Sequence, residues 1–137
     1  MKAAVMRGTQ QIAVEDIPTP EPGPNQVLVK IKYSGICGSD VHRFQYGMIN
    51  SGSVMGHEWC GTIAQLGLGV TTWKEGDRVL FGGGTPPPGK GSPMRTDPRF
   101  NYRERGLADG RLRAYAEYTL TAEWELTAVP DGVSDEQ

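Results

Sequence analysis

The stretch VLVKIKY at residues 27–33 decides the fold class of this chain. Its odd-numbered positions are all apolar or aromatic, whereas Lys30 and Lys32 share the opposite side with Leu28. Alternation with a period of two indicates a half-buried β-strand. The segment GICG at residues 35–38 follows and predicts a turn, so the strand is expected to end there.

Outward from this strand, several other short segments have the composition of strands. Four prolines between residues 18 and 24 separate the first strand from the second, because proline breaks both helices and central strands. Ser39 or Asp40 is expected to cap a short helix that runs through Tyr46. The expected strands are 2–6, 27–33, 59–66, 78–81, 112–120 and, before Pro130, 125–129.

The length of 137 residues suits one domain, 1–137. The chain is rich in turn formers, with 19 glycines and 10 prolines. Many turns, short strands and little helix predict a mainly β, barrel-like domain with a few short helices.

Charge and hydropathy exclude some classes of partner. The formal net charge of -2 gives no reason to expect a nucleic-acid partner. The opening MKAAVMRG lacks the apolar segment of a signal peptide, and no apolar run approaches the length of a membrane span. We therefore expect a cytoplasmic protein with reduced cysteines and no membrane partner.

A basic segment lies at residues 90–113, within a long stretch of low apolar content. Its seven basic and three acidic residues give +4, which leaves -6 for the rest of the chain. Long loops in compact domains are usually functional or disordered. We interpret the segment first as a solvated loop. Two alternatives are a contact with another subunit or domain and a role in attracting an anionic substrate.

Two places in the sequence offer metal-binding groups. Cys37 and His57 supply a soft sulfur and an imidazole, which zinc favours at bond lengths of about 2.3 and 2.0 Å. Glu58 adds a neighbouring carboxylate. A catalytic zinc needs three protein ligands and one open position. These residues therefore offer two good ligands and one candidate third.

Three motifs extend this pattern. They are GICGSDVH at residues 35–42, GHE at 56–58 followed by Gly61, and GDRV at 76–79. In order and approximate spacing they resemble the motifs of zinc-dependent medium-chain alcohol, sorbitol and butanediol dehydrogenases. The resemblance covers nearly the whole chain and implies the GroES-like N-terminal catalytic domain of that family, a partly open β-barrel.

The resemblance also implies roles for the residues of the motifs. Cys37 and His57 would be ligands of a catalytic zinc. Glu58 would be the adjacent carboxylate that can approach or transiently bind the metal. Ser39 would hydrogen-bond the substrate oxygen and pass its proton on.

Two further residues would support this chemistry. His42 would relay the proton to solvent, since imidazole titrates near neutral pH. Asp40 would hold a ligating imidazole and fix its tautomer. Zinc lowers the pKa of an alcohol oxygen, so that hydride can leave for a nicotinamide.

Each of these residues also has a simpler structural interpretation. Cys37 can be a buried thiol, and His57 a structural histidine. His42 can be a solvated residue of a helix. Ser39 and Asp40 can cap that helix, a role that does not exclude the catalytic one.

The resemblance sets the expected cofactors and partners. No cysteine follows Cys60, which we interpret as core filler in a strand, so we expect one catalytic zinc and no structural zinc. NAD or NADP would bind a Rossmann domain that is absent from this chain, and the chain alone would then be inactive. The parent would act on a small-molecule alcohol or carbonyl substrate and form a homo-oligomer.

Two other functions are alternatives. The chain can be a stand-alone, non-catalytic GroES-like module for binding or assembly, since fold does not determine function. It can also be a relative of zinc-free quinone reductases. The pair Cys37 and His57 favours the zinc-dependent dehydrogenase over both.

Overall fold

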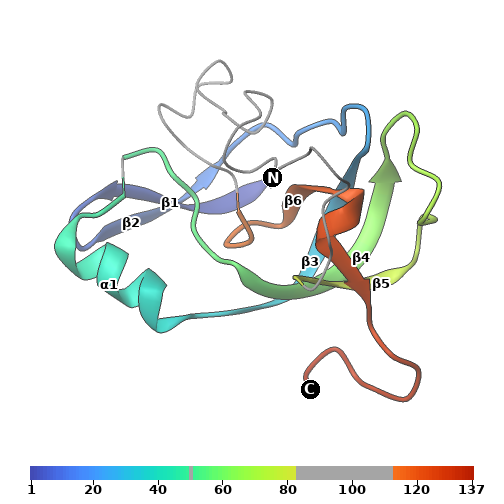
Figure 1. The fold of residues 1–137 in the computed structure, drawn as a ribbon. Helices are drawn as coiled ribbons and strands as arrows, with labels where there is room; N and C mark the ends of the chain where they lie inside the picture. Colours follow the sequence, from blue (N-terminus) through green and yellow to red (C-terminus); the bar gives the residue numbers. More distant parts are fainter. Residues whose placement is uncertain (50, 83–112) are drawn as a thin grey trace.

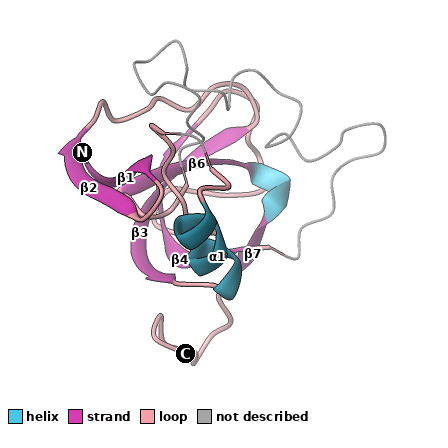
Figure 2. Ribbon diagram, turned by 90° about the vertical axis from the view of Figure 1, so that its left-hand side faces the viewer, coloured by secondary structure: helices cyan, strands magenta, loops and turns pink. Residues whose placement is uncertain are grey.

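The computed structural model describes residues 1–49, 51–82 and 113–137, which form two antiparallel sheets and one α-helix (Figure 1). Both views place the hairpin β1–β2 to one side of the larger sheet, and the C-terminal residues leave below that sheet (Figures 1 and 2). The elements are β1 (Lys2–Gly8), β2 (Gln11–Asp16), β3 (Gln26–Gly35), α1 (Gly38–Tyr46), β4 (Glu58–Leu66), β5 (Arg78–Phe81), β6 (Tyr118–Ala122) and β7 (Leu126–Ala128).

The larger sheet has the strand order β6-β3-β4-β5-β7, and all its pairs are antiparallel. Its two edge strands, β6 and β7, are separated along the chain only by the 3-10 turn Glu123–Glu125. Because this short connection joins the two edges, the sheet curls round toward closure. The prediction of a mainly β, partly open barrel is confirmed, although the described residues contain a single α-helix rather than a few.

Strand β3 lies at the centre of the fold and is covered on both faces. Val27 and Val29 are fully buried in a cluster on one face, as the alternation of the sequence predicted. Tyr33, assigned to the same face, is 43% exposed near the strand's end. The rest of that cluster comprises Trp59, Ile63, Val79, Ala114 and Leu126.

Leu28 departs from the sequence prediction, which placed it on the polar face with Lys30 and Lys32. It is buried in a second cluster, because the hairpin β1–β2 and its neighbours cover that face of the strand. The other buried members of this second cluster are Ala3, Val5, Ile17, Val54 and Leu120.

Element boundaries also differ from those expected. Strand β2 was not predicted, and β6 spans Tyr118–Ala122 rather than 112–120. Residues 113–117 make isolated pairings instead of a continuous strand. The Tyr115 N–H donates to the Met55 carbonyl, the Tyr115 carbonyl accepts from the Ala4 N–H, and Ala116 bridges Ala3. The segment therefore joins several parts of the structure, and alternation alone gave no sign of this.

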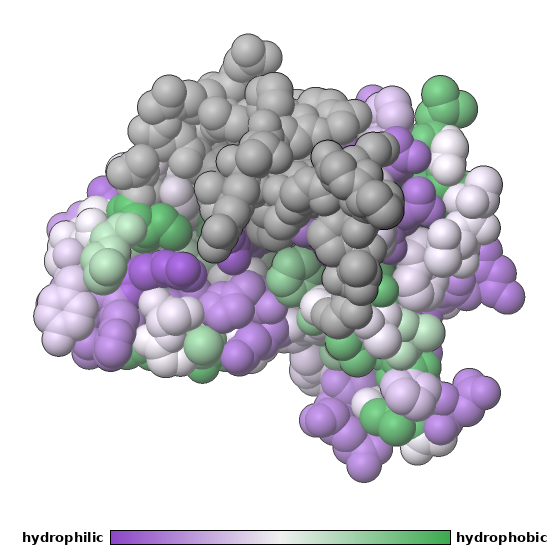
Figure 3. Space-filling view, in the orientation of Figure 1, coloured by the Kyte–Doolittle hydropathy of each residue, from purple (hydrophilic) through white to green (hydrophobic). Residues whose placement is uncertain are grey.

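The surface is mixed in character. On the face drawn in Figure 3, small hydrophobic areas are scattered among polar ones. In the part of the chain that the structure describes, no helix is long and apolar enough to cross a membrane. The basic segment 90–113 lies outside the described residues except for Arg113.

Candidate metal centre

The antiparallel pairing of β3 with β4 brings the candidate ligands together. Gly35 at the end of β3 pairs with Glu58 at the start of β4. Cys37 follows β3 as the N-cap residue of α1, with extended backbone (φ -74°, ψ 152°). His57 immediately precedes β4. Residues twenty positions apart therefore meet at one corner of the sheet.

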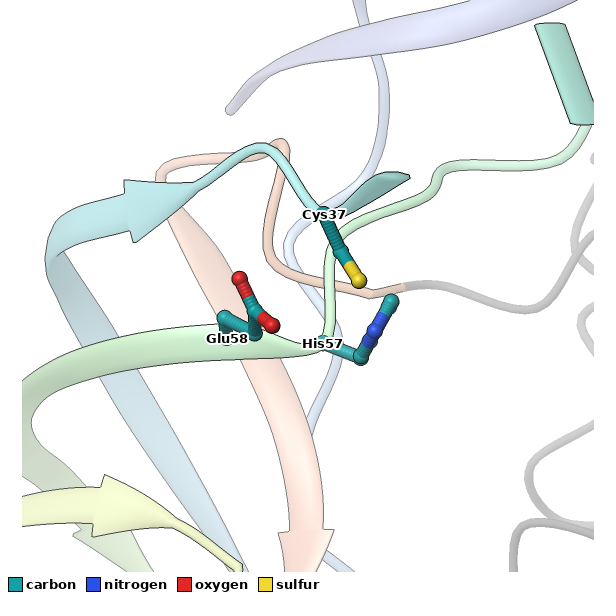
Figure 4. A group of neighbouring side chains, drawn as sticks. All are labelled: Cys37, His57 and Glu58. Atoms are coloured by element: carbon teal, nitrogen blue, oxygen red, sulfur yellow. The ribbon is translucent and has the colours of Figure 1, made fainter. Parts of the chain in front are cut away.

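At this corner, one ligand atom each from Cys37, His57 and Glu58 lies within 4.8 Å of the others. Figure 4 shows the Cys37 sulfur pointing toward the His57 ring, with the Glu58 carboxylate beside them. Cys37 and His57 are half-buried, whereas Glu58 is exposed. Zinc bonds are about 2.0–2.3 Å long, so small side-chain rotations would let these atoms share one ion.

Asp40, in the first turn of α1, supports the corner from below the surface, with its side chain only 1% exposed. Its Oδ2 accepts a hydrogen bond from the Cys37 backbone N–H at 3.3 Å. The same oxygen lies 3.4 Å from His57 Nδ1, without the alignment of a hydrogen bond. Arg43 Nη1 lies 3.7 Å from Asp40 Oδ1.

Unsatisfied polar atoms fit a metal-binding role for this corner. Asp40 Oδ1 and His57 Nδ1 are buried and lack a hydrogen-bond partner among the described residues. Such groups are uncommon in native proteins and call for an explanation. A sulfur, an imidazole and a carboxylate are also the donor types that zinc takes. The residues present therefore fit a zinc ion.

The two candidate proton-transfer residues are placed differently. Ser39 is exposed, and its Oγ lies 3.5 Å from His57 Nε2. His42 is exposed on α1, where its ring meets the edge of Tyr46 at a centroid distance of 5.9 Å. The structure thus brings Ser39, but not His42, into contact with a candidate ligand, and the relay role of His42 stays a prediction.

Sequence reasoning missed Tyr115. Its hydroxyl lies 3.0 Å from Asp40 Oδ2 and 3.2 Å from the Gly35 carbonyl oxygen, and can donate to either. Burial and the neighbouring Asp40 carboxylate raise the pKa of Tyr115 well above its usual range. Seventy-five residues separate Tyr115 from Asp40. No local motif could have shown the contact.

Cys60 lies outside the candidate metal centre. Expected as core filler, it is half-buried instead, and its Sγ donates to the Asp135 carbonyl oxygen at 3.1 Å. Burial raises the pKa of this thiol. Trp59 stacks on Phe81 with ring centroids 5.5 Å apart, and both line a small hollow that His57 also borders.

Comparison with known protein families places residues 23–131 in the family described as Alcohol dehydrogenase GroES-like domain. Several curated relatives match almost the whole chain, including the following two. Sorbitol dehydrogenase of Halalkalibacterium halodurans is 36% identical over 98% of this chain. An uncharacterized zinc-type alcohol dehydrogenase-like protein of Escherichia coli, YphC, is 36% identical over 99% of it. The chain spans only 40% and 42% of their lengths.

Solved structures show the same fold. The 2R,3R-butanediol dehydrogenase of Bacillus subtilis matches with a TM-score of 0.76 and 32% identity, over 99% of this chain and 42% of that one. Acetophenone reductase of Geotrichum candidum, in complex with NAD, matches with a TM-score of 0.74 and 34% identity, over 98% and 41%. The match again covers less than half of each longer protein.

Proposed function

This chain belongs to the Alcohol dehydrogenase GroES-like domain family, and we propose that it forms the zinc-binding part of a nicotinamide-dependent dehydrogenase of alcohols or polyols. The observation that carries the proposal is the convergence of Cys37, His57 and Glu58 within 4.8 Å. The relatives with matching sequences include a sorbitol dehydrogenase and a zinc-type alcohol dehydrogenase-like protein.

In this proposal, Cys37 and His57 hold the metal and Glu58 is the third donor. A bound zinc would polarise the oxygen of an alcohol and make its proton easier to lose. Ser39, whose Oγ is 3.5 Å from His57 Nε2, would accept that proton from the substrate hydroxyl and release its own hydroxyl proton to the solvent that it faces. Asp40 would orient the His57 ring through Nδ1.

The nucleotide and substrate belong to the whole protein. We assign NAD or NADP to a further, Rossmann-type domain, because the relatives are more than twice the length of the matched part and one matching structure is a complex with NAD. The substrate would be a small alcohol or carbonyl compound, as the names of the relatives suggest. Cytoplasmic location and a homo-oligomeric parent stay predictions.

The two histidines of the chain provide a matched test of the metal site. The chain would be titrated with Zn²⁺ in competition with a chromogenic chelator, as wild type, His57→Gln and His42→Gln. We expect about one tightly bound zinc per chain in the wild type and in His42→Gln. In His57→Gln, the zinc affinity should be lower by about 100-fold or more.

Either of two results would refute the metal site. One is a wild-type chain that binds no zinc; the other is a His57→Gln variant that binds as tightly as His42→Gln. Both would favour the alternative of a non-catalytic GroES-like module.

A further inference from the structure

The carboxylate of Asp40 needs hydrogen-bond donors, because a buried charge without partners is strongly destabilising. Its side chain is 1% exposed. Two donors among the described residues can hydrogen-bond to Oδ2: the backbone N–H of Cys37 at 3.3 Å and the hydroxyl of Tyr115 at 3.0 Å. His57 Nδ1 lies 3.4 Å from this oxygen but lacks the alignment of a hydrogen bond. Tyr115 is therefore the one side-chain hydroxyl that faces this carboxylate among the described residues.

The position of Tyr115 is fixed by its surroundings. Its backbone N–H donates to the Met55 carbonyl at 2.8 Å, and its carbonyl accepts from the Ala4 N–H at 2.7 Å. Its ring packs against Gly56, where an added Cβ would come within 2.6 Å of the ring. The phenol is thus held by the segment that leads directly into His57.

The single hydroxyl proton has two acceptors in reach, Asp40 Oδ2 at 3.0 Å and the Gly35 carbonyl oxygen at 3.2 Å. Hydrogen bonds to ionised acceptors are shorter and stronger than those to neutral ones, so the proton points to Asp40. Tyr115 consequently contacts the end of β3, the first turn of α1 and the approach to β4. These are the three segments that carry the candidate ligands.

We propose that Tyr115 is a positioning residue of the metal centre: its hydroxyl holds Asp40 Oδ2 beside His57 Nδ1, which keeps the proton on Nδ1 and leaves Nε2 free for a metal. The inference rests on the proposed function, since it assigns Tyr115 a task toward the zinc ion. Loss of a group that orients a metal-binding histidine commonly lowers metal affinity tenfold or more.

The test compares Tyr115→Phe with Tyr118→Phe. Both variants lose one phenolic oxygen at a half-buried position on the cluster around Leu28, but among the described residues only the Tyr115 hydroxyl hydrogen-bonds to Asp40. The first readout is the tautomer of His57 in the metal-free chain, measured by long-range ¹H–¹⁵N correlation at pH 8. His42 is the internal reference, since it is the other histidine of the chain. The second readout is Zn²⁺ affinity by chelator competition.

We expect the wild type and Tyr118→Phe to show His57 protonated at Nδ1, and Tyr115→Phe to show a mixture of tautomers. Zinc affinity should fall about tenfold in Tyr115→Phe only. In the double variant Tyr115→Phe/Asp40→Asn, affinity should equal that of Asp40→Asn alone, because residues that act through one another are not additive. A merely structural role would lower stability without this pattern.

The outcomes separate the two proposals. A wild-type chain that binds zinc, together with Tyr115→Phe showing wild-type tautomer and affinity, overturns the role of Tyr115 and leaves the metal site standing. Additive losses in the double variant overturn it as well. A wild-type chain that binds no zinc overturns both. If Tyr115→Phe proves too unstable to measure, the tautomers of His57 are measured in Asp40→Asn instead. A mixture of tautomers is expected there, and a single Nδ1-protonated form would overturn the inference.

Discussion

The two cysteines of the chain lie in regions that differ in how fully their polar atoms are hydrogen-bonded. Cys37 belongs to the metal-site corner, which we define as Cys37, Asp40, His57 and Glu58. Cys60 belongs to the tail clamp, where residues 130–137 lie against β3, β4 and β5. The tail clamp consists of Lys32, Tyr33, Cys60, Arg78, Val133, Asp135 and Glu136.

The two regions differ in whether their polar atoms have hydrogen-bond partners. In the tail clamp, Arg78 donates from Nε to Asp135 Oδ1 at 2.8 Å and from Nη2 to the Val133 carbonyl at 2.7 Å, and Cys60 donates to the Asp135 carbonyl. In the metal-site corner, Asp40 Oδ1 and His57 Nδ1 have no hydrogen-bond partner within residues 1–49, 51–82 and 113–137.

This difference indicates which cysteine is suited to a metal. The thiolate is the form of cysteine that binds metals. Burial raises the pKa of Cys60, which keeps its thiol protonated as a hydrogen-bond donor within a saturated network. Cys37 instead lies beside the exposed Glu58 carboxylate and the His57 imidazole, whose Nδ1 lacks a hydrogen-bond partner among the described residues.

The largest expected effect separates the two cysteines directly. Cys37→Ser should weaken zinc binding at least about 100-fold, because it removes a ligand and not only an outer partner, whose loss costs about 10- to 100-fold. Cys60→Ser should leave zinc affinity within about twofold of wild type, as its sulfur is engaged elsewhere. Chelator competition measures both, and equal losses in the two variants would break the contrast between the regions.

The next effect concerns the packing of the metal-site corner. Gly56→Ala should destabilise the chain by about 2–4 kcal/mol, since the new Cβ would lie 2.6 Å from the Tyr115 ring at a backbone φ of +100°. Gly132→Ala in the tail has a similar φ of +81° but open space around it, so only about 1 kcal/mol of backbone strain is expected. Urea denaturation gives both values. Equal losses would show that Tyr115 does not pack tightly on Gly56.

A smaller effect is expected for the tail clamp. Arg78→Gln should cost about 1 kcal/mol, because the arginine side chain is 39% exposed and such ion pairs are partly screened by water. It should also increase hydrogen exchange at the amide of Gln137 and its neighbours, while zinc affinity stays unchanged. Arg7→Gln, which breaks the pair with Glu15 on the hairpin, is the matched control and should leave exchange in the tail as in the wild type. Loss of zinc affinity in Arg78→Gln would mean that the two regions are coupled.

The smallest effect is a pH dependence within the tail clamp. The Tyr33 hydroxyl donates to Glu136 Oε1 at 2.7 Å, and this hydrogen bond raises the pKa of Tyr33 above its ordinary value of about 10. The folded state thus holds the proton longer than the unfolded chain does. The contribution of this contact is complete below pH 10 and is lost as the pH rises through the raised value.

Ultraviolet titration can detect this shift as the difference between wild type and Tyr33→Phe. The phenol should ionise at higher pH in the wild type than in Glu136→Gln, which removes the acceptor charge. If Tyr33 ionises at the same pH in Glu136→Gln as in the wild type, Glu136 does not hydrogen-bond to Tyr33.

The sequence determined the parts of this protein that depend on local pattern. Alternation along residues 27–33 marked the central strand, and the turn after it marked the approach to α1, although Cys37 caps the helix rather than Ser39 or Asp40. Each candidate ligand lies in a short motif that surrounds it in the chain. The family follows from the same motifs and is confirmed by the match over residues 23–131.

Only the tertiary structure decided which groups face one another across the fold. The sequence placed Leu28 on the polar face of its strand with Lys30 and Lys32. It is buried because the N-terminal hairpin covers that face. Tyr115 meets Asp40, and Cys60 meets Asp135, across separations of 75 residues. The physical reason is that hydropathy and turn chemistry act between near neighbours, whereas these hydrogen bonds form only after the strands have paired and brought distant segments into contact.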